Sequence, residues 1–387
     1  MAASPVDDDT VEEVFDDQPT GVELERNAIE SVADKLWDPA QIRVATRQFS
    51  IRNVLDMIDE QTLELAPDFQ RNRVWKARQK SRLIESVILQ IPLPAFYFAE
   101  DGDGQFRVVD GLQRLSTIYD FVRGGKDTGF ALAELEYLDD EDGKRFNDLS
   151  APFIRRMNNA QIVVNVIDPV TPPEVTYNIF KRLNTGGTPL NTQEIRHCMS
   201  KGRSRDFLKR LTSMPEFARA AGSSLQNHVR MVDREVALRF CAFKIMGFER
   251  ERLVRGMDGF LELATTMLDD PAKVSDERLD QLAESFRVAM VNAHNVFGAH
   301  AFRKWPLGNE KNSLFNRALF ESWALALAEV PEQTAARNAS EIALLARESM
   351  RNNREYIDAI TFTTNDPNKI DYRFKHAREI LAKVASL

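Results

Sequence analysis

The sequence has few cysteines and no long apolar segment. Cys198 and Cys241 are its only cysteines, and they do not form a Cys-x-x-Cys pair. A disulfide framework and a zinc site are therefore not expected, and a reducing compartment fits this composition. No apolar run approaches the roughly 20 residues that a membrane-spanning helix needs, and the N-terminus lacks the basic-then-apolar pattern of an export signal. We expect a cytoplasmic protein without a membrane partner.

A strongly basic charge balance is also missing. The net charge is −8, but the acidity is concentrated in residues 1–38, where twelve Asp and Glu face only Arg26 and Lys35. This segment has a balance of −10, which leaves +2 for the rest of the chain. We expect residues 1–40 to form a disordered, solvated acidic tail. A second interpretation is a tail that competes with nucleic acid for a basic groove.

The spacing of hydrophobic residues changes near residue 200. Before that point, helical patterns follow Ser50 and Asn191 and cover 77–90, 113–122 and 172–184. Strand-like runs cover 63–65, 95–100, 106–109 and 158–168. Glu194 stands three residues after Asn191, the spacing of a capping box. From about residue 203 onward only helical spacing remains. The sequence therefore predicts an α+β domain at 41–200 followed by an all-α domain at 201–387.

A strand end meets a helix start in FRVVDGLQRLSTIYDF, residues 106–121. Unpaired N–H groups and the dipole of a helix start favour an anion, and Gly111 lets a phosphate approach the backbone. Arg114 can direct a planar fork of donors at that anion, and Asp110 can hold Mg²⁺. These residues favour a site for nucleotide phosphates. The alternative is a plain strand-to-helix turn, with Asp110 as N-cap and Arg114 as a surface charge.

A basic stretch with an indole, APDFQRNRVWKARQ, covers residues 66–79. Gln70 and Arg71 follow a short predicted strand, with Trp75 close by. Such a stretch can hold phosphates and stack a base. The alternative is that Trp75 anchors the core and the cations form a solvated surface.

Paired glycines occur in FKRLNTGGTPLNTQE, residues 180–194, after Arg182 and Asn184. Gly186 and Gly187 can act as a hinge or allow the backbone to approach a ligand. The alternative is a capped loop between two helices.

Together the three segments resemble the ParB/sulfiredoxin-like N-terminal domain family of GmrSD/SspE-type DNA restriction (defence) proteins. The matching residues, in chain order, are Phe69-Gln70-Arg71 with Val74-Trp75, Asp110-Gly111-Leu112-Gln113-Arg114, and Arg182-Leu183-Asn184 with Gly186-Gly187, Leu190 and Gln193-Glu194. The resemblance implies a ParB/sulfiredoxin-like α+β domain that binds a nucleoside triphosphate with Mg²⁺. Family members are expected to use hydrolysis of that nucleotide to gate action on modified DNA.

The resemblance also assigns roles to individual residues. The expected catalytic residues are Asp110, Gln113 and Arg114, and Asp110 is the expected Mg²⁺ ligand. The expected nucleotide-binding residues are Gln70, Arg71, Gly111, Arg182, Asn184, Gly186 and Gly187.

Two departures from the family pattern bear on activity. Leu112 stands where the family has a glutamine, and Phe69 where it has a tyrosine, so binding is expected to survive while turnover weakens. No histidine lies in the pattern of a His-Asn-His nuclease; the five are His197, His228, His294, His300 and His376.

Three functions stay open at this point. The first is a nucleoside-triphosphate-binding component of a restriction-type system without its own nuclease, which hydrolyses weakly or only with DNA or a partner nuclease subunit. The second is a non-catalytic, ParB-like DNA-binding module, and the third is a regulatory subunit whose site has decayed. An oligomer is compatible with each of them.

Overall fold

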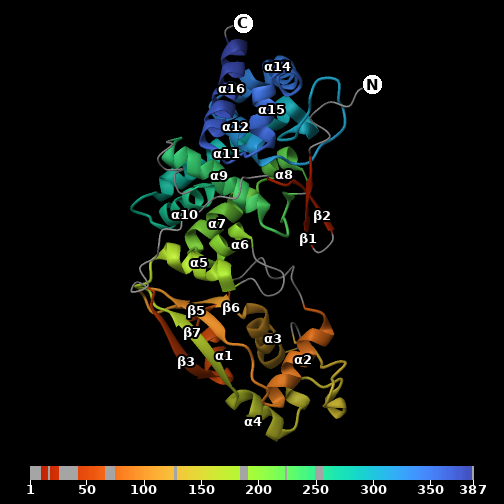
Figure 1. Ribbon diagram of the computed structural model, residues 1–387, viewed down its shortest axis with the longest axis vertical. Helices are drawn as coiled ribbons and strands as arrows, with labels where there is room; N and C mark the ends of the chain where they lie inside the picture. Colours follow the sequence, from red (N-terminus) through yellow and green to blue (C-terminus); the bar gives the residue numbers. More distant parts are fainter. Residues whose placement is uncertain are drawn as a thin grey trace. The chain divides into compact units, whose positions relative to one another are not determined.

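The structure is a computed structural model that describes residues 10–15, 18–25, 42–65, 75–125, 129–183, 191–222, 225–248 and 256–385 (Figure 1). The chain divides into two compact units. The first, which we call the α+β unit, is Lys35–Met199. The second, the helical unit, combines Met1–Asp34 with Ser200–Leu387.

The α+β unit contains a five-stranded sheet and six α-helices among its described residues. Its elements are β3 (Val44–Ser50), α1 (Ile51–Asp59), β4 (Leu63–Glu64), α2 (Ala77–Ile88), β5 (Phe96–Glu100), β6 (Phe106–Asp110), α3 (Leu112–Arg123), α4 (Ala151–Asn159), β7 (Gln161–Ile167), α5 (Pro173–Leu183) and α6 (Thr192–Met199), with short 3₁₀ turns η3 (Asp139–Glu141) and η4 (Phe146–Asp148).

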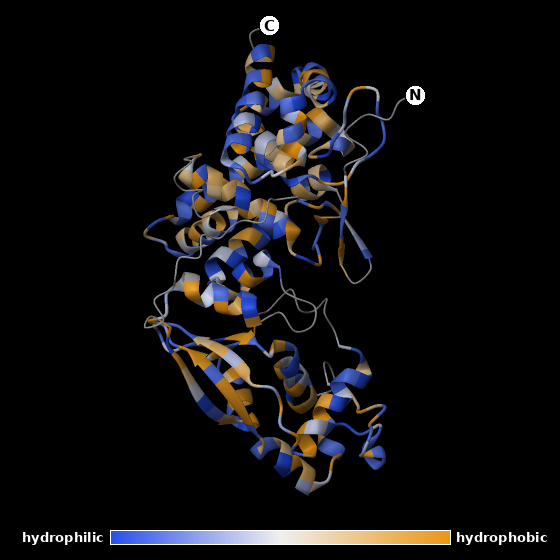
Figure 2. Cartoon of the chain, in the orientation of Figure 1, coloured by the Kyte–Doolittle hydropathy of each residue, from blue (hydrophilic) through white to orange (hydrophobic). Residues whose placement is uncertain are grey.

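The strand order of the sheet is β3-β7-β5-β6-β4. β7 pairs antiparallel with β3 and parallel with β5, while β6 pairs antiparallel with β5 and parallel with β4. Residues from one face of the sheet form a single core with apolar residues of α1, α2, α3 and α4. Figure 2 shows how hydrophobic the central strands are. On the β6 side, α5 and α6 pack against the sheet.

Local signals fix several of these boundaries. The Ser50 hydroxyl accepts a hydrogen bond from the Asn53 N–H at 3.2 Å and caps α1. At α6, Asn191 Oδ1 accepts from the Glu194 N–H at 2.8 Å, and Glu194 Oε2 accepts from the Asn191 N–H at 2.7 Å. The capping box predicted from the spacing of these two residues is therefore present.

The helical unit is built from ten α-helices among its described residues, after an N-terminal pair of strands. Its elements are β1 (Glu12–Phe15), β2 (Gln18–Glu23), α7 (Gly202–Thr212), α8 (Pro215–Ala221), α9 (Val232–Met246), α10 (Gly256–Asp269), α11 (Asp276–Phe297), η7 (Gly298–His300), α12 (Arg317–Leu327), α13 (Glu332–Arg337), α14 (Ala339–Asn352), α15 (Arg354–Thr361) and α16 (Pro367–Ala385). A second hydrophobic core, separate from that of the α+β unit, joins these helices. The predicted fold class, an α+β region followed by an all-helical region, is confirmed.

The N-terminal segment differs from its prediction. The prediction of a disordered acidic tail is wrong for residues 10–15 and 18–25, because they form the β1–β2 hairpin and its continuation. Val22 is fully buried in the core of the helical unit. The N–H of Glu23 donates to the Phe315 carbonyl at 2.9 Å, and the N–H of Phe315 donates to the Gly21 carbonyl at 3.0 Å. The segment is therefore bonded to the helical unit through its backbone.

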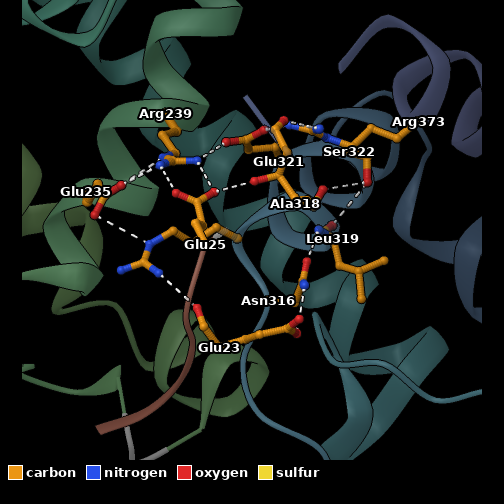
Figure 3. Close-up of polar contacts among 12 residues, drawn as sticks. Glu23, Glu25, Glu235, Arg239, Asn316, Ala318, Leu319, Glu321, Ser322 and Arg373 are labelled. Carbon is orange, nitrogen blue, oxygen red and sulfur yellow. Dashed lines mark hydrogen bonds and ion pairs between the residues drawn. The ribbon is translucent and has the colours of Figure 1, made fainter. Parts of the chain in front are cut away.

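Acidic side chains of this segment neutralise buried cations of the helical unit. Glu25 lies 2.8 Å from an Arg239 nitrogen (Figure 3). Glu23 lies 2.5 Å from Lys304 Nζ. Glu13 pairs with Arg317 at 2.7 Å. Acidic composition suggested solvation, but partners more than 200 positions away along the chain place these carboxylates inside the protein.

No helix in the described part of the chain is both long enough and apolar enough to cross a membrane.

Candidate functional site

The predicted turn lies at the end of a central strand. β6 ends at Asp110, Gly111 is the N-cap residue and α3 begins at Leu112. Gly111 has φ = +93°, and a Cβ at this position would lie 2.3 Å from Phe96 Cδ1. Both the backbone conformation and the lack of space require glycine here.

Arg114 holds the turn against the start of β5. Its guanidinium donates to the carbonyls of Pro94 and Ala95, the latter at 3.2 Å, and to Asp110 Oδ2 at 3.0 Å. It also lies 4.4 Å from the centroid of the Phe96 ring. Burial lowers the pKa of Arg114, and the neighbouring carboxylate of Asp110 opposes that shift. The alternative of Arg114 as a surface charge is therefore wrong, and three of its five N–H donors already have protein acceptors.

The N-terminus of α3 has no side-chain cap. Ser50 caps α1 and Ser275 caps α11 through side-chain oxygens, whereas α4, α7 and α9 lack a side-chain cap as α3 does. Asp110 does not cap α3, because it precedes the N-cap residue and its carboxylate bonds to Arg114. The alternative of Asp110 as N-cap is wrong. The start of α3 retains the character of an anion site.

Asp110 meets the requirements of one Mg²⁺ ligand. Its side chain is 34% exposed, so the carboxylate is accessible next to the start of α3. Across the described residues, no group of three or more His, Cys, Asp and Glu could hold a metal ion. Mg²⁺ is commonly bound by one or two carboxylates together with phosphates and water. A magnesium ion at Asp110 would thus depend on a phosphate ligand.

Leu112 and Gln113 lie differently in the first turn of α3. The Leu112 side chain is 7% exposed and packs in the core of the α+β unit, so position 112 adds no polar group to the site in this chain. Gln113 is half-buried, and its backbone carbonyl accepts from the Thr117 hydroxyl at 2.7 Å.

The structure describes only some of the other predicted residues. Gln70, Arg71, Asn184, Gly186 and Gly187 lie outside the described residues. Arg182 is exposed in the last turn of α5, the helix that packs against β6. Trp75 is half-buried against the core of the α+β unit, in agreement with the alternative of a core anchor.

Three polar residues beside Asp110 were not predicted. Tyr97 on β5 pairs with Asp110, Asn165 on β7 pairs with Tyr97, and Thr46 on β3 pairs with Asn165. We call Thr46, Asn165, Tyr97 and Asp110 the polar row. The only sequence signal was a polar residue inside an apolar run at 95–100 and at 158–168, whose pairing the sequence does not specify.

One family model matches the α+β unit. Residues 51–200 match the model described as GmrSD restriction endonuclease, N-terminal domain. The match begins at the first residue of α1 and ends one residue after α6, so it includes the Asp110 turn and leaves out β3. No curated protein matches the sequence.

Proposed function

Because residues 51–200 form a GmrSD restriction endonuclease N-terminal domain, which implies a component of a restriction system, we propose that this domain binds a nucleoside triphosphate at the Asp110 end of its sheet. The observation that supports the proposal is a helix start without a side-chain cap beside a partly exposed carboxylate. The two features together suit a phosphate chain with Mg²⁺.

Each residue of the turn has a distinct part in the proposal. Backbone N–H groups at the start of α3 bind phosphate oxygens, and Gly111 leaves the space for them to approach. Asp110 holds Mg²⁺, which when bound would neutralise phosphate charge. Arg114 is a positioning residue, because its bonds to Pro94 and Ala95 fix where Asp110 and the helix start lie. For turnover, we propose that Gln113 orients a water molecule.

The turn alone provides too little binding free energy. Micromolar affinity needs about 8 kcal/mol, whereas charge-assisted hydrogen bonds contribute roughly 1.5–3 kcal/mol each before desolvation and ordering are subtracted. We therefore propose that further groups complete the site. They are Gln70, Arg71, Arg182, Asn184, Gly186 and Gly187.

Equilibrium binding of ATP, GTP, CTP and UTP, each with Mg²⁺, tests the proposal. We expect the wild-type protein to bind at least one of them, and Asp110→Asn to bind it at least tenfold more weakly. Asp103→Asn is the matched control, because Asp103 is exposed at the 101–105 turn of the same unit. If the wild-type protein binds none of the four nucleotides, the proposal is wrong.

DNA and a partner nuclease subunit are proposed partners of the same system. Arg78 and Arg82 on α2 are accessible, but each forms an ion pair, with Glu134 at 3.7 Å and with Glu136 at 3.2 Å. DNA phosphates would have to displace these carboxylates. Because neutralising the phosphates releases DNA counterions, binding should weaken steeply as salt is added. A mobility-shift series at rising salt concentration measures that dependence.

A further inference from the structure

The polar row crosses four adjacent strands at one level of the sheet. Residues paired directly across strands share a face of the sheet. The pairs Thr46–Asn165, Asn165–Tyr97 and Tyr97–Asp110 are all in register. The four paired positions therefore form one line from the edge strand β3 to the Asp110 turn.

The opposite face of these strands is occupied by the hydrophobic core. Phe96 and Phe98 on either side of Tyr97 are fully buried in that core, as are Val164 and Val166 on either side of Asn165. Because side chains alternate along a strand, Tyr97 and Asn165 point away from the core. Both are half-buried and Thr46 is exposed, so the row can be reached from solvent.

A β-bulge brings Asp110 into this row. The register between β5 and β6 shifts between Tyr97 and Phe98, because Tyr97 pairs with Asp110 but Phe98 pairs with Val108. The additional residue on β6 is Val109. Bulges of this kind redirect side chains and are common next to active sites. Here the bulge places Asp110 opposite Tyr97, with its carboxylate bonded to Arg114.

Polar atoms of the row remain available to a ligand. The Thr46 hydroxyl donates to Asn165 Oδ1 at 2.8 Å, which orients the amide and leaves its Nδ2 as a donor. No described residue forms a hydrogen bond with Asn165 Nδ2 or with the Tyr97 hydroxyl. An oriented amide donor beside an aromatic ring is a suitable combination for a nucleoside, since the ring can stack and the amide can bond to a polar edge.

We propose that Tyr97, Asn165 and Thr46 bind the nucleoside part of the nucleotide whose phosphates lie at Asp110, an inference that rests on the proposed function. Neighbouring strands lie about 4.8 Å apart, so the row extends about 14 Å from Asp110 to Thr46. In this arrangement the base stacks on the Tyr97 ring, and Asn165 Nδ2 donates to an acceptor on the edge of the base. Thr46 is a positioning residue that holds the amide in this orientation.

Binding of Mg²⁺ with a nucleoside triphosphate and, separately, with inorganic tripolyphosphate distinguishes the nucleoside site from the phosphate site. We expect Asn165→Ala and Tyr97→Leu each to weaken nucleotide binding about tenfold and to leave tripolyphosphate binding within twofold of wild type. Tyr97→Phe, which keeps the ring, should bind the nucleotide more tightly than Tyr97→Leu. Thr46→Val should lose less than Asn165→Ala, because only the orientation of the amide is affected.

Gln48→Ala is the matched control. Gln48 is exposed, two residues from Thr46 on the same strand and face, and pairs with Val163 outside the row. It should bind nucleotide and tripolyphosphate as the wild type does. The inference is overturned if Asn165→Ala and Tyr97→Leu bind the nucleotide as tightly as wild type, or if both ligands weaken equally in these variants. A wild-type protein that binds neither ligand overturns the proposed function itself, and this inference with it. Thr46→Val lies on an exposed strand, so it tests the row even if the Tyr97 variants fold poorly.

Discussion

The two units use arginine–carboxylate pairs in opposite ways. In the helical unit, Glu321 and Arg373 are fully buried, and Glu321 also bonds to Arg239 at 2.5 Å (Figure 3). In the α+β unit, Asp110 and Arg114 form a pair whose carboxylate is 34% exposed. A buried network of paired charges stabilises one arrangement of the chain, whereas a partly exposed pair at the end of a strand can change partners. The buried pairs of the helical unit stabilise the fold, and the pair at Asp110 is the one in a position to bind a ligand.

The buried network is tightly coupled. Arg239 contacts Glu25, Glu235 and Glu321, and the carboxylates around it raise its pKa although burial acts in the opposite direction. Burial alone would raise the pKa of Glu25, but Arg239 and Arg317 outweigh it and hold that pKa below its ordinary value. Removing one member leaves a buried charge without its partner.

The largest effect is expected when the centre of this network is neutralised. Glu321→Gln removes the carboxylate partner of the buried Arg373 and one of the three carboxylates around Arg239, and breaking a buried pair of this kind costs about 3–5 kcal/mol. The free energy of unfolding of the helical unit, measured in denaturant, should fall by that amount. Glu284→Gln is the control, because Glu284 pairs with Arg287 on the surface, where such pairs are worth about 0–1 kcal/mol. Equal losses of unfolding free energy in the two variants would contradict the distinction between buried and surface ion pairs.

A pH-dependent effect is expected where the N-terminal hairpin meets the helical unit. Burial lowers the pKa of His228 to about 4, and the ring contacts the Thr20 carbonyl at 3.3 Å and accepts from the Arg230 N–H at 3.1 Å. Since the folded pKa lies below the ordinary 6.5, the stabilisation is complete above pH 6.5 and is lost as the pH falls to 4. The free energy of unfolding should fall by about 3 kcal/mol over this range.

Comparison of the wild type with His228→Asn isolates this term. Burial raises the pKa of Asp233 to about 6, and this residue acts in the opposite direction as the pH falls. Both proteins contain Asp233, so its contribution cancels in the comparison. The difference in unfolding free energy between the two proteins should therefore shrink between pH 6.5 and 4. A difference that stays constant across this range would contradict the assignment to His228.

Next in size is the effect of a side chain at Gly111. Gly111→Ala combines a left-handed backbone conformation with a Cβ only 2.3 Å from Phe96 Cδ1, so we expect a loss of about 2–3 kcal/mol. Gly104 also has a positive φ, +79°, but nothing lies within 4 Å of its added Cβ. Gly104→Ala should cost only about 1 kcal/mol. Thermal unfolding of the two variants separates crowding from backbone strain.

A smaller effect is expected at Arg114. Arg114→Lys keeps the charge but cannot hold the carbonyls of Pro94 and Ala95 together with Asp110, so stability should fall by about 1–2 kcal/mol. If Arg114 positions the turn, nucleotide binding should weaken in the same variant. Unchanged binding despite lower stability would show that Arg114 has no part in positioning the site.

How much the sequence predicts depends on the distance over which a feature is determined. The Ser50 cap, the Asn191–Glu194 capping box and the strand–glycine–helix turn at Asp110 are set within a few residues, so local patterns reveal them. The docking of Glu23 onto Lys304 and the pairing of Tyr97 with Asn165 depend on partners far along the chain. Local spacing does not determine strand register or long-range charge pairing, so neither the hairpin nor the polar row was predicted.

The smallest effect on stability, and the most direct test of the central claim, is expected at Asp110. Its pair with Arg114 is partly exposed, so Asp110→Asn should lower stability by less than about 1 kcal/mol. The decisive measurement is calorimetric titration of a nucleoside triphosphate into wild type and Asp110→Asn, with and without Mg²⁺. We predict that the wild type loses affinity when Mg²⁺ is removed, and that Asp110→Asn binds weakly in both conditions. Tight, Mg²⁺-dependent binding by Asp110→Asn would contradict the account.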